Sequence, residues 1–188
     1  MRMLVVVMAL AEIAGANPYR ARELVAEGRA ESDDGRALAH FEQAIDQDVD
    51  ALEAYEAAIP LWIRTGQLAA MRRRLERVTL RHPRFAPAWY ALGYAYRQAG
   101  RPELAVLAYR SYVSLRPGEA APYFGLAMAY KSIGRPTRAE RTFLRYLRLE
   151  RDPAQAAFVD QARAEVLVLA LRRLGLVPAL EPGAGGPP

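Results

Sequence analysis

Glycine, aromatic and proline residues recur at one constant spacing through the middle of this chain. The recurring positions are Gly66, Gly100 and Gly134; Tyr55, Trp89 and Tyr123; and Pro83 and Pro117. A constant spacing of about 34 residues, which we call the repeat period, is typical of solenoids in which each repeat is a pair of helices. The sequence therefore predicts an all-α fold of stacked pairs, because one pair is too small to bury its own apolar face.

The stretch from Ala86 to Glu119 shows how one pair is built. The apolar residues of its first half share one helical face, namely Trp89, Leu92, Ala95 and Tyr96. Gly100 is expected to end this helix, since glycine adopts a left-handed backbone at no steric cost. Pro102 then suits the first turn of a second, antiparallel helix. We expect Tyr109, on that second helix, to fill the gap between neighbouring pairs.

The repeat resembles the tetratricopeptide repeat over Leu52–Pro153. The central unit matches that family at Trp89, Leu92, Gly93, Tyr96, Gly100, Ala105, Tyr109 and Pro117. The next unit matches at Tyr123, Leu126, Ala127, Tyr130, Gly134, Ala139 and Phe143. The resemblance implies a right-handed α–α superhelix of stacked antiparallel helix pairs, closed by a C-terminal capping helix. It also implies a concave groove, lined by the first helix of each pair, that binds a protein or peptide.

The repeat pattern divides the chain into seven segments. We expect a signal peptide or N-terminal helix at 1–17, a degenerate helix pair at 18–51, repeats at 52–85, 86–119 and 120–152, a capping helix at 153–175 and a disordered tail at 176–188. The side chains expected in the groove are aromatic or basic, apart from one methionine: Arg64, Tyr90, Tyr94, Arg97, Phe124, Met128 and Lys131. This lining suits an extended or helical peptide with apolar anchors and an acidic group. The aromatic rings could equally pack against the adjacent unit.

The N-terminal segment is open to two interpretations. Arg2, the apolar run Met3–Ala11 and the small residues Ala14–Ala16 resemble a signal peptide, which would place the mature protein in the periplasm or outside the cell. Otherwise the segment is a helix that covers the first repeat, and the protein is cytoplasmic. The apolar run is about 9 residues long, where a membrane span needs about 20. A transmembrane helix is therefore not expected here.

Charge is distributed unevenly along the chain. Residues 1–60 hold 5 basic and 12 acidic side chains, whereas residues 61–188 hold 21 and 9, giving −7, +12 and the total of +5. One group of arginines shares a helical face, with spacings of 3, 4 and 3: Arg138, Arg141, Arg145 and Arg148. This face could bind an acidic protein surface or nucleic acid, or be a solvated outer face. Abundant alanine, and arginine in place of almost all lysine, indicate a GC-rich bacterial genome.

Catalytic and metal-binding motifs are absent from the sequence. There is no cysteine, no His-Glu-x-x-His helix and no phosphate-binding glycine loop before Lys-Ser/Thr. Asp46, Asp48 and Asp50 do not form a calcium loop, because the glycine and glutamate that such a loop requires are missing. Asp50 is instead expected to cap the next helix, with Glu53 completing a capping box. The sequence predicts a non-enzymatic protein without cofactors.

The C-terminal helix carries more apolar residues than a cap requires. Asp152 and Pro153 mark its start, and Val166–Leu171 is apolar nearly all round. A terminal helix that covers one open end of a stack needs only one apolar face. The surplus indicates a second contact, either a homo-oligomer formed through 158–174 or the tail folding back.

Overall fold

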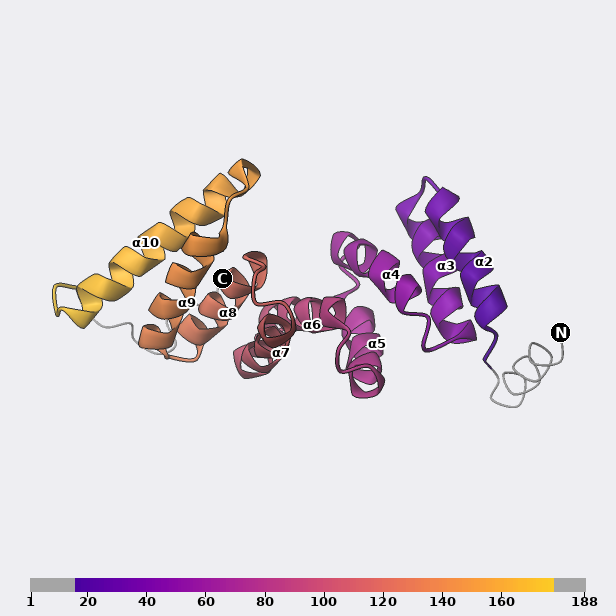
Figure 1. Cartoon of the computed structure of the whole chain (residues 1–188), viewed down its shortest axis with the longest axis horizontal. Coiled ribbons are helices and arrows are strands. Elements are labelled where there is room, and N and C mark those ends of the chain that lie inside the picture. The colour runs from indigo at the N-terminus through magenta and orange to yellow at the C-terminus, as the bar shows by residue number, and fades with distance from the viewer. Residues whose placement is uncertain (1–15, 178–188) are drawn as a thin grey trace. The chain divides into compact units, whose positions relative to one another are not determined.

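The computed structural model describes residues 16–177, and every regular element in that range is a helix (Figure 1). The chain divides into two compact units between Ala91 and Leu92. The first contains α2 (Pro18–Ala30), α3 (Asp34–Gln47), α4 (Leu52–Arg64), α5 (Leu68–Arg81) and the start of α6 (Ala86–Gln98). The second contains the rest of α6, α7 (Pro102–Leu115), α8 (Ala121–Ser132), α9 (Pro136–Leu149), the 3₁₀ turn η1 (Pro153–Gln155) and α10 (Ala156–Arg173).

Consecutive helices pack on one another within each unit, as they do for α2 with α3 and for α8 with α9. The all-α class predicted from the sequence is therefore confirmed. The signal peptide expected near the N-terminus and most of the expected tail fall at 1–15 and 178–188, outside the described residues.

Glycines at the predicted spacing make the turns between paired helices. Gly66, Gly100 and Gly134 have φ of 71°, 66° and 65°, a backbone region that a side chain would strain. Proline then occupies the first position of α7 and of α9, where its missing N–H has no intrahelical acceptor. The same turn is thus built with the same residue types one repeat period apart.

Trp89 and Tyr123 occupy equivalent environments in successive pairs. The Trp89 indole N–H donates to the carbonyl oxygen of Pro83 at 2.8 Å, and the Tyr123 hydroxyl donates to that of Pro117 at 3.1 Å. The two donors are one repeat period apart in the sequence, and so are the two acceptors. The aromatic residue therefore ties the start of each pair to the loop before it, which explains why either ring type serves.

Tyr109 fills the space between two first helices, as the sequence predicts. Its ring is 2% exposed and lies against Gly93 of α6 and Gly125 of α8. A Cβ at either glycine would come nearer than 3.0 Å to that ring. These glycines are needed for close approach, because no larger residue leaves room for the tyrosine.

The capping role expected for Asp50 is wrong. Ala51 precedes α4 and makes no side-chain capping bond. Asp50 instead accepts two hydrogen bonds from Arg81, both at 2.7 Å, and its Oδ1 lies 2.9 Å from Nε2 of His82. The residue ties the α3–α4 loop to the end of α5. Asp152 does cap as expected, since it accepts from the Ala154 N–H at 2.9 Å.

Candidate protein-binding surface

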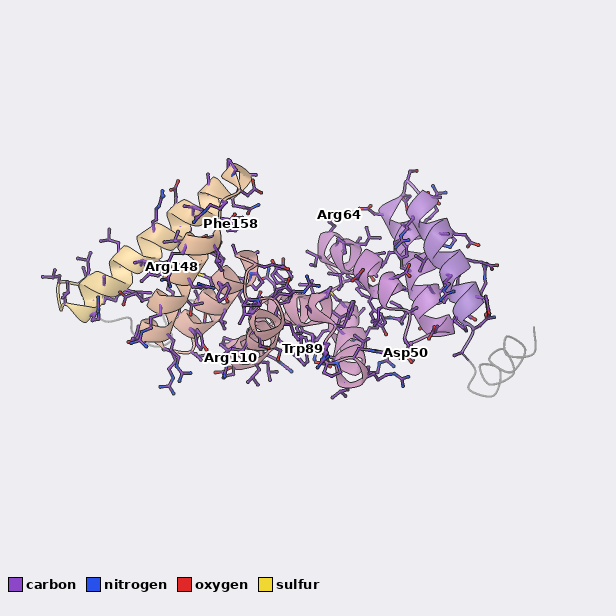
Figure 2. The ribbon with its side chains drawn as sticks, viewed as in Figure 1. Asp50, Arg64, Trp89, Arg110, Arg148 and Phe158 are labelled. Atoms are coloured by element: carbon purple, nitrogen blue, oxygen red, sulfur yellow. The ribbon has the colours of Figure 1, made fainter. Side chains whose placement is uncertain are left out.

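Arg64 makes an exposed ion pair within the first unit. It is the last residue of α4 (Figure 2). Its guanidinium donates to both carboxylate oxygens of Asp34 on α3, at 2.8 and 2.6 Å. The hydrogen bond from Arg64 lowers the pKa of Asp34. Tyr90, on α6, is half-buried and also belongs to the first unit. The five other predicted residues lie in the second unit.

Tyr94 and Arg97 form a compact group on α6. The Arg97 guanidinium lies over the Tyr94 ring, with Cζ 5.8 Å from the ring centroid, while Gln98 donates to the Tyr94 hydroxyl at 3.0 Å. Both Tyr94 and Arg97 are half-buried. The Nε–H of Arg97 is buried and has no acceptor among the described residues. A buried charged donor without an acceptor is costly, so this guanidinium is a candidate binding group.

Phe124 of α8 packs inside the second unit. Its ring makes edge-on contacts with Phe143 and Tyr146 of α9 and with Phe158 of α10, at centroid distances of 5.7, 5.4 and 5.2 Å. Phe124 therefore packs against neighbouring helices, which is one of the two roles that the sequence allowed for the aromatic residues. Phe158 remains 48% exposed, so the cluster reaches the surface on the α10 side (Figure 2).

Lys131 of α8 is also engaged by α10. Its ammonium lies 2.6 Å from the Glu165 carboxylate, and the two side chains are 28% and 15% exposed. Met128, one turn earlier, is half-buried. Phe158 follows Phe124 by one repeat period, and Glu165 follows Lys131 by the same interval. The sequence interpretation missed both partners, although the same spacing would have identified them.

Three of the predicted residues in the second unit are the main candidates for contacting a partner. Tyr94 and Arg97 on α6 and Met128 on α8 belong to successive first helices, which are joined through Tyr109. They offer an aromatic face, a thioether and a guanidinium without a carboxylate partner. Such a combination suits an apolar side chain followed by an acidic group.

The arginines of α5 and α9 differ in their partners. On α5, Arg72 pairs with Glu76, Arg74 with Asp46 and Arg81 with Asp50. Acids before Pro60 therefore neutralise part of the basic charge that follows. On α9, by contrast, four exposed arginines have no carboxylate partner among the described residues, namely Arg138, Arg141, Arg145 and Arg148.

Two of the α9 arginines lie over tyrosine rings. Arg138 is 5.8 Å from the centroid of Tyr130, and Arg145 is 5.8 Å from that of Tyr123. These contacts hold part of the basic face in place at the surface. Arg141 and Arg148 stay exposed beside them.

Three other kinds of feature are relevant to the function of the described residues: a pocket, a metal site and a membrane-spanning helix. A hollow of about 280 Å³ lies between α2 and the start of α4, where Arg22, Asp48 and Glu53 line it, but none of the predicted site residues does. Between residues 16 and 177, no group of three or more His, Asp or Glu side chains could hold a metal ion. No helix in the same range is long and apolar enough to cross a membrane.

Comparison with known families and structures identifies the repeat. The tetratricopeptide repeat family matches residues 86–128 and, separately, residues 123–157. No curated protein matches the sequence. A crystal structure of MamA protein is 17% identical with a TM-score of 0.69, covering 83% of this chain and 81% of that chain.

Two further solved structures share the fold. A second crystal structure of MamA is 22% identical with a TM-score of 0.62, covering 75% of this chain and 82% of that chain. A thermophilic TPR protein of Thermus thermophilus is 19% identical with a TM-score of 0.57, covering 83% of this chain and 84% of that chain. At these identities the likeness concerns the fold alone, and it confirms the stacked helix pairs expected from the sequence.

Proposed function

We propose that this chain, which is a tetratricopeptide repeat protein and an interaction scaffold, is non-enzymatic and holds a peptide or protein partner on the first helices of its second unit. Tyr94, Arg97 and Met128 are the contact residues in this proposal. Phe124 and Lys131 support them from α8 while they hold α10 in place. Arg64 and Tyr90 would contribute separately, from the first unit.

The observation that carries the proposal is the state of Arg97. Its Nε–H is buried without an acceptor, whereas Lys131, one repeat period later, has Glu165 as its partner. The Tyr94 ring beneath the guanidinium keeps it in place and offers an apolar surface beside the charge. A carboxylate from a partner would pair with the guanidinium at its accessible part, since Arg97 as a whole is only half-buried, and an apolar side chain next to it would cover Tyr94 and Met128.

A peptide display library tests this proposal even though the partner is unidentified. Peptides selected on the wild-type chain should carry an acidic residue near an aromatic or aliphatic one. Their affinity, measured by isothermal titration calorimetry, should fall at least tenfold for Arg97→Glu and for Tyr94→Ala. Arg110→Glu, an exposed change on α7, is the matched control and should bind as the wild type does. Selected peptides that bind all variants equally would place the site elsewhere.

A role in a cell-envelope assembly is proposed from the sequence of the N-terminal segment. Its apolar run and small residues resemble a signal peptide, which would lead to the periplasm or to secretion. Fractionation of the native host, followed by sequencing of the mature N-terminus, tests this assignment. A protein that keeps Met1 and stays in the cytoplasm would contradict it.

The arginines of α9 support a second candidate function, the binding of an anionic surface or nucleic acid. The observation that favours it is that all four arginines of this face lack a carboxylate partner among the described residues, whereas three of the five arginines of α5 have one. The salt dependence of binding separates the two candidates. Each phosphate contact steepens the fall of affinity with salt, whereas aromatic anchoring responds weakly.

A further inference from the structure

The last helix, α10, occupies the place of the first helix in a fifth pair. Phe158 and Glu165 repeat the positions of Phe124 and Lys131 one repeat period later and contact them directly. The turn glycine of that pair, however, is replaced by Val168. The helix therefore continues for 18 residues, whereas α4 and α8 have 13 and 12. It ends only at Gly175, whose φ is 72°.

One side of α10 is buried in the second unit and the opposite side is exposed. Ala162 and Leu169 are 0% and 3% exposed, and α10 packs on α9. Leu167 and Leu174 are 60% and 67% exposed. The exposed side continues through three more residues without charge, of which Ala164 is exposed and Val168 and Leu171 are half-buried.

Residues 164, 167, 168, 171 and 174 recur every three or four positions and so share one stripe of the helix. We call these five residues the α10 stripe. Asp160 and Arg163, just before the stripe, pair with each other at 3.3 Å. The stripe itself is thus an uncharged strip along more than half of α10, most of it in the part of the helix that extends beyond the length of a first helix.

The sequence that follows α10 does not favour a second helix that would cover the stripe. The second helices α7 and α9 each have 14 residues. Residues 178–188 number eleven and include four prolines, at 178, 182, 187 and 188. Proline inside a helix removes a hydrogen bond and clashes with the preceding turn. A helix of the required length is therefore expected to come from elsewhere than this segment.

We propose that a second copy of this chain covers the α10 stripe with its own α10, the two helices running antiparallel about a two-fold axis near Leu167 and Val168. Four of the five stripe residues meet one another in this arrangement: Ala164 and Leu171 lie equally far from the axis, so a small residue meets a large one, and Leu167 meets Val168. Leu174 lies opposite Gln161 at the edge of the contact. A two-fold contact of this kind is closed and uses one patch twice. The alternation of three and four residues suits two packed helices.

Sedimentation velocity on the full chain tests the proposal. The wild type should have about twice the mass of 20.9 kDa at high micromolar concentration. Leu167→Glu combined with Leu174→Glu should return the monomer mass with an unchanged circular dichroism spectrum, since both side chains are exposed. Leu107→Glu, 58% exposed on α7, is the matched control and should leave the dimer intact. A monomeric wild type, or a dimer that survives both stripe substitutions, would overturn the proposal.

Cross-linking tests the antiparallel geometry, and the chain has no cysteine to interfere. Leu167→Cys lies near the proposed axis, so mild oxidation should give disulfide-linked dimers. Leu174→Cys should not cross-link, because the two copies of that residue would be about 20 Å apart along the helices, beyond the reach of a disulfide. Efficient cross-linking at 174 without cross-linking at 167 would contradict the arrangement.

Discussion

The fit of Tyr109 between two glycines is the tightest contact at the level of single residues. We predict that Gly125→Ala lowers the free energy of unfolding by about 1–2 kcal/mol, because the new methyl group would overlap the buried ring. Alanine has a higher helix propensity than glycine, but this gain offsets only about 1 kcal/mol of the destabilisation caused by the overlap. Urea denaturation at neutral pH measures the difference.

Gly118→Ala is the control for that substitution. A Cβ at Gly118 would have no atom within 4 Å, and its φ is not positive, so stability should change by less than about 0.5 kcal/mol. Equal midpoints for Gly125→Ala and the wild type would show that Tyr109 can move aside.

Asp50 makes stability depend on pH. Hydrogen bonds from Arg81 and, to a smaller extent, from His82 lower its pKa from 3.8 to about 2. A carboxyl group whose pKa is lower in the folded state stabilises the fold above its unfolded pKa, and this contribution disappears as pH falls towards the folded pKa. The contribution is therefore present at pH 7 and is lost between about pH 4 and pH 2.

We predict that Asp50→Asn is less stable than the wild type by about 1 kcal/mol at pH 7, a figure reduced for screening because the side chain is 42% exposed. The difference between the two proteins should shrink as pH falls from 4 towards 2. Urea titrations at several pH values measure it. A difference that stays constant with pH would mean that the Asp50 carboxylate adds nothing through its charge.

The local signals of the sequence predicted helix ends better than they predicted contacts between elements. Gly100, Pro102 and Asp152 act within a few residues, and each does what its type predicts. Asp50 has the same local pattern as a cap, but its partner Arg81 lies 31 residues away and binds both carboxylate oxygens. A capping rule that considers only neighbours in sequence does not include that competitor.

At the scale of elements, the side-chain contacts between α8 and α10 are the feature that the sequence interpretation did not foresee. Phe124 and Lys131 were predicted to line a groove, and the residues that contact them lie in the helix that was expected to cap the stack and to make a second contact elsewhere. The period that revealed the repeats also extends to Phe158 and Glu165. This extension of the repeat was not recognised because Val168 stands at the position of the turn glycine. The next glycine, Gly175, comes seven residues later, so the segment does not look like a repeat.

The Lys131–Glu165 pair should couple α8 to α10 energetically. We predict that Lys131→Met costs about 1–3 kcal/mol, since it leaves the Glu165 carboxylate, 15% exposed, without its counter-charge. Glu165→Gln in the same chain should recover at least half of the loss, because a neutral amide needs no counter-charge. Urea unfolding of the four proteins in this double-mutant cycle gives the coupling energy. Additive effects of the two substitutions would show that the pair is not coupled.

At the scale of the whole molecule, the net charge of +5 does not show which basic side chains are neutralised by an acidic partner. Acidic residues before Pro60 supply partners for arginines of α4 and α5, as in the pairs Asp34–Arg64 and Asp46–Arg74. The arginine face of α9 receives no such partner from the described residues. Four exposed arginines without a carboxylate partner in the described part of the chain therefore share one face of a single helix in the second unit, a placement that net charge alone does not reveal.

Two charge-matched variants test whether this concentration matters. Arg141→Glu with Arg148→Glu, on α9, and Arg73→Glu with Arg77→Glu, on α5, each change the net charge by −4, from +5 to +1. All four arginines are exposed, so both variants should fold. We predict that the α9 variant elutes from heparin at lower salt than the α5 variant. The reason is that Arg141 and Arg148 belong to a row of four arginines without carboxylate partners among the described residues, whereas Arg73 and Arg77 stand beside arginines that are paired with acids. Equal elution would mean that heparin senses only net charge and that the α9 face is an ordinary solvated surface.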